Sequence, residues 1–189
     1  HAKVLSVDTS KAAAVPGIQA IVTADDTPMI GVGVTKDNPP LKKDIVRSFR
    51  DELVAVAGET EDAVDKAIAL IEVEYEDLPV ILDPVEAMEE GAMQLHDDKP
   101  GNISLAYQTL HGDIKKAEDN SDHVLDEVYN VHYVTHVCMG PGCVVADFDT
   151  NGKLTMYTQT QYPYNYKMDL APALGMHPGD IRVIQPPVG

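Results

Sequence analysis

Residues 53–84 constrain the fold most, because their hydrophobic pattern changes period twice. Residues 53–57 form a short apolar run, and Thr60 follows as an N-cap residue for a helix. Apolar residues then recur at helical spacing over residues 63–71. Over residues 71–76 they alternate with three glutamates, which is the pattern of a half-buried strand with an acidic, solvated outer face. The stretch therefore predicts a strand, a helix and a second strand.

The N-terminal residues repeat this order on a smaller scale. Apolar residues alternate from Val4 to Val7, and the polar run Asp8-Thr9-Ser10 can cap a short alanine-rich helix that ends before Gly17. Residues 18–23 return as an apolar strand. Residues 25–43 lose all periodicity and predict a long loop. The loop contains a Gly-x-Gly pair, but neither the third glycine nor the helix of a dinucleotide fingerprint follows.

Residues 83–102 gather proline, glycine and charge, which is typical of a linker. Beyond it, residues 111–122 offer one short helix, and residues 123–136 alternate in the manner of a long strand. Residues 144–158 read as a hairpin, because Thr150-Asn151-Gly152 is a turn sequence that accepts positive φ. The C-terminal part predicts a helix over residues 162–174, with Gly175 at its C′ position, and a strand over residues 181–184. The pattern as a whole is that of a two-part, mixed α/β chain.

The charge of the chain narrows the classes of partner. With 189 residues and a net charge of −17, it lacks the clustered lysines and arginines that bind nucleic acid or an anionic membrane. It also has no apolar run of membrane-spanning length and no signal-peptide pattern, so we expect a cytoplasmic protein. Two cysteines, Cys138 and Cys143, are too few for a disulfide framework and fit a reducing compartment.

One cluster of potential metal ligands stands out. His132, His136 and Cys138 share one face if residues 123–136 are a strand, and Cys143 follows a turn. Zinc accepts histidine and cysteine ligands, so a zinc-binding protein is one hypothesis. The alternative is that these are ordinary half-buried side chains, because the spacing matches no standard zinc finger or ribbon.

A second constellation lies where a predicted strand leads into a predicted helix. Gln159 and Gln161 occupy this junction, just before Pro163. Amide side chains and free helix N–H groups at such a junction can meet an anionic cofactor. The alternative is that Gln161 is a surface residue or a cap, as most glutamines are exposed.

Several segments together resemble a known family. They are residues 1–26, 51–88 and 151–189. The most specific part of the likeness is a series of short motifs along the chain, in the order Asp8-Thr9-Ser10-Lys11-Ala12, Glu72-Val73-Glu74-Tyr75, Gly112-Asp113, Thr160-Gln161 and Val188-Gly189. This series is similar to the molybdenum-binding subunit of the xanthine dehydrogenase and aldehyde oxidase family, which also includes carbon monoxide dehydrogenase and 4-hydroxybenzoyl-CoA reductase. The resemblance extends over nearly the whole chain.

The resemblance implies a fold and a site. It implies a hammerhead-type α/β domain over residues 1–84, a linker over residues 85–102, and the truncated beginning of an α+β molybdopterin-binding domain over residues 103–189. Gln161 matches the family's cofactor-contacting glutamine. Gly189 matches the first glycine of the Gly-Gly-Phe-Gly loop, whose backbone amides contact the cofactor.

The resemblance also implies a function: a fragment of a molybdopterin-dependent oxidoreductase of the xanthine, aldehyde, aromatic heterocycle or hydroxybenzoyl-CoA type. The family's general-base glutamate lies downstream, so the expectation is no catalytic or metal-ligating residue here and no activity from this chain alone. Molybdopterin belongs to the complete enzyme, with none expected on this fragment. FAD and iron-sulfur clusters lie on other subunits or domains. The partners are thus the remainder of the subunit and the iron-sulfur and FAD subunits; the alternative is a separately encoded, non-catalytic scaffold subunit.

Two short stretches depart from the family pattern. The family's His-x-x-Met/Leu-Glu element ends here in Met139-Gly140, and Gly142 replaces a bulkier polar residue. Arg50-Asp51-Glu52 stands where many members have Gly-Glu-Pro. The first departure is expected near the cofactor or substrate, so analogy names no substrate, whereas the second lies on the scaffold.

Overall fold

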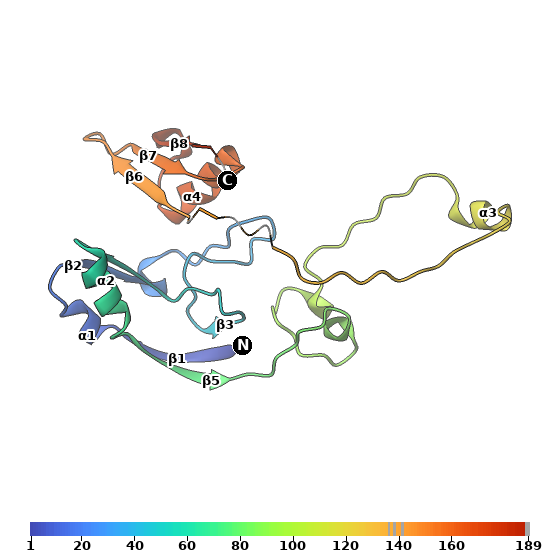
Figure 1. The fold of residues 1–189 in the computed structure, drawn as a ribbon, viewed down its shortest axis with the longest axis horizontal. Helices are drawn as coiled ribbons and strands as arrows, with labels where there is room; N and C mark the ends of the chain where they lie inside the picture. Colours follow the sequence, from blue (N-terminus) through green and yellow to red (C-terminus); the bar gives the residue numbers. More distant parts are fainter. Residues whose placement is uncertain (136, 138, 141, 188–189) are drawn as a thin grey trace.

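The computed structural model describes residues 1–135, 137, 139–140 and 142–187 (Figure 1). Strands β1 to β5 lie with α1 and α2 in one group, and β6 to β8 lie with α4 in another. Between the groups the chain makes a long excursion that carries α3 at its far end. The elements are β1 (Ala2–Asp8), α1 (Ser10–Ala13), β2 (Ile18–Thr23), β3 (Ile45–Val46), β4 (Val54–Gly58), α2 (Glu61–Ile68), β5 (Glu72–Asp77), α3 (Ile114–Asp119), β6 (Val144–Phe148), β7 (Leu154–Thr158), α4 (Pro163–Ala173) and β8 (Ile181–Ile184).

The N-terminal group confirms both predicted strand-helix-strand units and joins them. The outer strands pair across the units: β1 pairs antiparallel with β5, and β2 pairs antiparallel with β4. The short β3 pairs with the other edge of β1. The two helices contact each other, and Ala12 of α1 and Ala67 of α2 are completely buried. Each strand-helix-strand unit therefore pairs both of its strands with strands of the other unit.

Close packing in this group depends on small residues. A side chain at Gly58 would place its Cβ 2.9 Å from Cγ2 of Val64 and 3.1 Å from the carbonyl oxygen of Gly17. Gly17 itself has a φ of 92°, a conformation that residues with a Cβ rarely adopt. Thr60 caps α2 as predicted, accepting a hydrogen bond from the Ala63 amide at 3.2 Å. The backbones of α2, β2 and β4 can therefore approach closely.

The predicted acidic face of β5 is exposed, and residues of β1 and α1 supply partners for it. Glu72 forms an ion pair with Lys11, which raises the pKa of that lysine. Glu74 accepts a hydrogen bond from Ser6 Oγ at 3.0 Å. Glu76 lies 4.0 Å from the Lys3 ammonium. Glu74 and Glu76 thus pair across strands with β1, and Glu72 pairs with α1; such exposed pairs contribute modestly to stability.

The C-terminal group confirms the predicted hairpin, helix and strand. Strands β6 and β7 are antiparallel, and Gly152 in their turn has a φ of 78°. Helix α4 then crosses over so that β8 pairs parallel with β7. The hydrophobic core of this group consists of Leu154, Met156, Ala171 and Ile181, with Tyr166, Leu170, Met176 and Val183 packed against it.

The long strand predicted over residues 123–136 is wrong for the part that the structure describes. Residues 123–135 contain no strand, and every described residue from 103 to 135 is exposed. A strand requires a neighbour for its backbone N–H and C=O groups. This segment lies in the excursion, away from the described sheets (Figure 1). An alternating pattern is therefore not enough to form a strand when no neighbouring strand is there to pair with it.

The region predicted to be a linker contains ordered turns. Two short 3₁₀ helices, Glu86–Met88 and Pro100–Asn102, flank a loop. The Asn102 side chain donates to the carbonyl oxygens of Ala87 (2.8 Å) and Met93 (2.9 Å) and accepts from the Leu95 amide at 2.7 Å. One amide side chain therefore holds the loop together. None of the helices in the described part of the chain has both the length and the apolar character to cross a bilayer.

Candidate functional site

The parallel pair β7 and β8 creates an edge suited to ligand binding. Tyr157 lies opposite Ile184 in their register. Residues 159–161 therefore leave β7 at the same edge at which residues 185–187 leave β8. Ligands of open sheets with parallel strands bind outside the carboxyl ends of those strands. The fold thus brings the Gln161 segment and the chain after β8 to one edge.

The β7 end of this edge is firmly anchored. Leu154, Met156 and Thr158 are buried in alternation, which fixes one face of β7 against α4 and β8. The Tyr162 amide donates to Thr160 Oγ1 at 3.2 Å, so the turn between β7 and α4 is also held. The residues that enter the junction therefore start from a rigid strand, which limits the positions that Gln161 can take.

Gln161 is exposed at this junction, and its side chain has no hydrogen-bond partner among the described residues. Its amide therefore offers donors and an acceptor to a ligand. Helix α4 begins two residues later with Pro163 and has no acidic side chain in its first turn. Its N-terminal end carries a partial positive charge that favours anions. Gly189, the other predicted cofactor contact, lies outside the described residues.

Asp169 anchors α4 to the N-terminal group, a contact that sequence reasoning missed. Its carboxylate accepts a hydrogen bond from the Gly33 amide at 3.0 Å and forms an ion pair with Lys36. Both interactions hold the pKa of Asp169 below its usual value, with the Lys36 bond the larger cause. Gly31 has no room for a side chain, since an added Cβ would lie 1.7 Å from the Lys36 carbonyl oxygen. No local pattern joins residues more than 130 positions apart.

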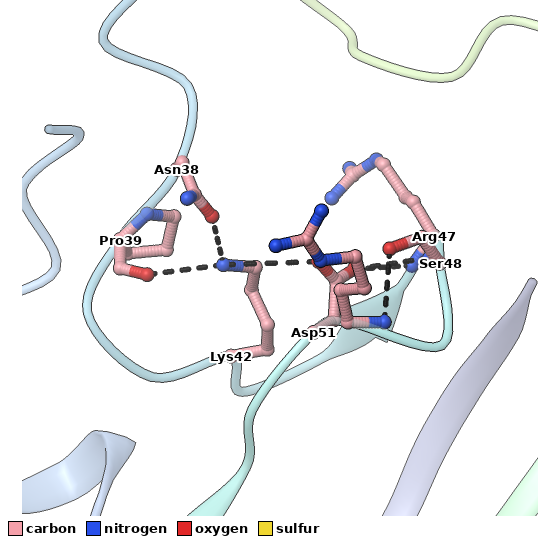
Figure 2. A network of polar contacts seen from close by, with 7 residues as sticks. Asn38, Pro39, Lys42, Arg47, Ser48 and Asp51 are labelled. Carbon is pink, nitrogen blue, oxygen red and sulfur yellow. Dashed lines mark hydrogen bonds and ion pairs between the residues drawn. The ribbon is translucent and has the colours of Figure 1, made fainter. Parts of the chain in front are cut away.

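A second polar site surrounds Lys42, whose side chain is only 7% exposed (Figure 2). Its ammonium contacts Asn38 Oδ1, donates to the Pro39 carbonyl oxygen at 3.0 Å and lies 4.0 Å from Asp51 Oδ1. The other Asp51 oxygen accepts from the Arg47 amide at 2.6 Å. A pocket of about 440 Å³ opens beside this network. Lys42 is followed by Lys43 in the sequence, and no sequence pattern pointed to a site there.

The cluster proposed to bind zinc is only partly described. His132 and Cys143 are both exposed, whereas His136 and Cys138 lie outside the described residues. Among residues 1–135, 137, 139–140 and 142–187, no group of three or more histidine, cysteine, aspartate or glutamate side chains is arranged to hold a metal ion. The described residues therefore supply no metal centre to build a function on.

Comparison with family models divides the chain in two. Residues 1–79 match the a/b hammerhead domain of aldehyde oxidase and xanthine dehydrogenase. Residues 95–189 match the molybdopterin cofactor-binding domain. The second match alone covers half of the chain, and it contains β6, β7, α4, β8 and Gln161. Both matches are to parts of the same class of enzyme.

Individual relatives agree with these matches. The chain is 33% identical to the nicotinate dehydrogenase large molybdopterin subunit of Eubacterium barkeri, covering all of this chain and 44% of that protein. It is 36% identical to a probable xanthine dehydrogenase subunit of Bacillus subtilis (strain 168), covering all of this chain and 25% of that protein. The chain therefore spans between a quarter and less than half of the length of these curated relatives.

Solved structures show the same fold. Carbon monoxide dehydrogenase from Oligotropha carboxidovorans superposes with a TM-score of 0.83 at 28% identity, covering all of this chain and 26% of that chain. The aldehyde oxidoreductase of Desulfovibrio gigas superposes with a TM-score of 0.82 over 97% of this chain and 22% of that chain. At 21% identity, the latter likeness shows the fold alone.

Proposed function

The chain belongs to the molybdenum-binding subunits of the xanthine dehydrogenase and aldehyde oxidase family, and on that premise we propose that it serves a molybdopterin-dependent oxidoreductase. In this proposal residues 1–84 are the hammerhead domain, residues 85–102 are the linker and residues 103–189 open the cofactor-binding domain. The family-model matches, which end at residue 79 and resume at residue 95, support this division. Activity is assigned to the whole protein, because this chain spans only part of its relatives.

The observation that carries the proposal is the position of Gln161. Gln161 lies at the carboxyl edge of a parallel strand pair, directly before the N-terminus of a helix. No described residue forms a hydrogen bond with its side chain. An exposed amide and free helix amides fit an anionic cofactor with several polar groups. We assign Gln161 to binding and orienting molybdopterin. Gly189 is assigned to the same cofactor through its backbone amide, on the family resemblance.

The cofactor supplies the redox chemistry, which in this family hydroxylates an electron-poor carbon with oxygen from water. This chain's residues position it: β7 and α4 hold the turn that carries Gln161, and the Asp169 contacts hold α4 against residues 33–36. No residue of this chain is assigned a proton-transfer role. The substrate is left unassigned, because the relatives named above act on different compounds.

The proposed partners are the remainder of the molybdenum-binding subunit and subunits or domains that carry iron-sulfur clusters and FAD. Relatives named as parts of assemblies support this, among them the 6-hydroxypseudooxynicotine dehydrogenase complex subunit gamma of Paenarthrobacter nicotinovorans. A net charge of −17 argues against nucleic acid as a partner. A cytoplasmic location is part of the proposal and is supported by the low cysteine content.

The test replaces Gln161 in the assembled enzyme. Gln161→Ala removes one hydrogen bond to a charged group, which is worth about 1.5–3 kcal/mol and corresponds to roughly 10- to 150-fold weaker cofactor retention. Molybdenum content per subunit, measured by mass spectrometry after dialysis, checks the expectation. Gln159→Ala is the matched control, because Gln159 is the same residue type, is also exposed and lies two positions upstream.

The expected result is loss of molybdenum from Gln161→Ala and normal content in Gln159→Ala. Thermal unfolding of both variants should match the parent, since neither side chain is buried. Equal molybdenum content and equal turnover in the parent and Gln161→Ala would remove Gln161 from the cofactor site.

A further inference from the structure

Cationic side chains gather around one pocket of a strongly acidic chain. The chain contains three arginines in all, and two of them, Arg47 and Arg50, line the pocket of about 440 Å³ beside Lys42. His96 lines it as well. We propose that this pocket binds a small organic anion whose carboxylate or phosphate group is held by the guanidinium groups of Arg47 and Arg50. The site goes beyond the proposed cofactor function and does not involve Gln161.

The carboxylates that line the pocket leave the arginines unneutralised. Asp51 is engaged by the backbone amides of Arg47 and Ser48 and faces Lys42. Asp37 accepts a hydrogen bond from Thr35 Oγ1 at 2.6 Å. Glu52 is exposed. Within the part of the chain that the structure describes, neither arginine forms an ion pair, although acidic residues outnumber basic ones by 31 to 14.

Lys42 is already committed to the protein and is therefore not the ligand-binding group. Its ammonium is held by Asn38 and Pro39 and lies close to Asp51, as Figure 2 shows. This network lines part of the pocket and orients Asp51, whose carboxylate in turn holds the backbone amide of Arg47. The buried lysine thus keeps the loop in the shape that presents the two arginines.

Arg47 is preorganised for anion recognition. Its Nε donates to the Leu95 carbonyl oxygen at 2.6 Å, which fixes the plane of the guanidinium and leaves the terminal nitrogens to face a ligand. Leu95 is itself held by Asn102 Oδ1 at 2.7 Å. Arg50 has its backbone amide bonded to Ser48 Oγ at 3.1 Å, and its side chain is exposed. A guanidinium fork held in place matches the two oxygens of a carboxylate or phosphate group.

The size and charge of the site indicate the kind of ligand. A volume of about 440 Å³ falls in the range of small-molecule sites and leaves room for an organic group attached to the anionic one. The overall charge of −17 repels anions from the protein as a whole. An anion that binds must therefore gain its affinity from local contacts in the pocket. Measured anion binding thus distinguishes a specific site from nonspecific electrostatic attraction.

The test titrates the protein separately with inorganic phosphate and with acetate, using isothermal calorimetry at low ionic strength. Binding of phosphate alone assigns a phosphate-bearing ligand, and binding of acetate alone assigns a carboxylate. Arg50→Gln should weaken the bound probe about tenfold, since it removes one charge-assisted contact. Arg182→Gln, which replaces an exposed arginine of β8, is the matched control and should bind like the parent.

Arg47→Gln should abolish measurable binding, and its thermal unfolding temperature shows whether the Leu95 loop still folds. Arg50→Gln keeps the test decisive if Arg47→Gln unfolds, because the Arg50 side chain makes no described hydrogen bond. The proposal is overturned if neither probe binds the parent, or if Arg50→Gln and Arg182→Gln bind the probe with the same affinity. Neither result would affect the Gln161 assignment, which is measured by molybdenum content.

Discussion

The N-terminal and C-terminal groups are both built from strand-helix-strand units, yet they are packed differently. Helices α1 and α2 of the N-terminal group bury alanines, and Gly58 allows β4 to lie against α2. The C-terminal group instead buries larger side chains, among them Leu154 and Ile181. The stability of the first group therefore depends on close approach of its backbones. The stability of the second depends on large apolar side chains that fill its core.

The two groups also pair their strands differently. In the N-terminal group each unit donates strands to the other, so that β1 pairs with β5 and β2 with β4, both antiparallel. In the C-terminal group β7 and β8 flank one helix and pair with each other in parallel. Among the strand pairs that the structure describes, only β7 and β8 place two carboxyl ends at the same edge, and that edge carries the proposed cofactor contact. The difference in pairing thus separates scaffold from site.

The largest expected effect comes from truncating the C-terminal core. Leu154 is only 1% exposed on the central strand of its sheet. Leu154→Ala should lower the free energy of unfolding by about 2–5 kcal/mol, because it removes apolar contacts and leaves a cavity. Urea denaturation followed by circular dichroism measures the change. Leu105→Ala, at a position 67% exposed, should change it by less than about 0.5 kcal/mol.

The N-terminal group should instead be sensitive to an increase in side-chain size. Ala67 is completely buried where α2 packs, so Ala67→Leu adds volume that the close packing cannot accept. We expect a loss of about 1–3 kcal/mol in the free energy of unfolding. Ala69→Leu, at the exposed C-cap of the same helix, is the control. If Ala67→Leu is as stable as Ala69→Leu, the contrast between the two kinds of packing does not hold.

The smallest effect concerns the contact between the groups. Asp169→Asn should cost no more than about 1 kcal/mol at pH 7, because Lys36 is largely exposed and such pairs are well screened. The pKa of folded Asp169 lies below its usual value, so its contribution is present above the unfolded value of about 3.9. That contribution is lost as the pH falls through the folded pKa.

Urea denaturation of parent and Asp169→Asn between pH 7 and pH 3 tests this. The stability difference should stay constant down to about pH 5 and shrink in more acidic solution. Asp147→Asn, at an exposed aspartate of β6 with no ion pair in the described part of the chain, should show no such difference. A difference that grows on acidification would contradict the assigned role of Asp169.

Local signals predicted the elements well where a tertiary partner existed. The Thr60 cap, the alternation in residues 71–76 and the Thr150-Asn151-Gly152 turn each led to the expected element. The same alternation over residues 123–135 led to no strand, since no neighbour in the described part of the chain pairs with it. Periodicity reports which side chains share a face and is silent on whether a partner is present.

The candidate sites also differ in whether local sequence signals could reveal them. Gln161 could be found from the sequence, because a strand end, an amide and a helix start are adjacent in the chain. The Lys42 pocket and the Asp169 contact could not be found, since they join residues from distant segments such as Arg47 with Leu95 and Gly33 with Asp169.

The sequence by itself determined most of the helices and strands, though not β3, together with the acidic character of the chain and the family resemblance, because caps, turn residues and periodicity act over a few neighbouring positions. The tertiary structure alone decided that β1 pairs with β5, that β8 lies parallel to β7, and that two arginines share a pocket with a buried lysine. Those outcomes depend on which surfaces bury each other. Such burial is settled by contacts between segments far apart in the chain, for which no local pattern provides a signal.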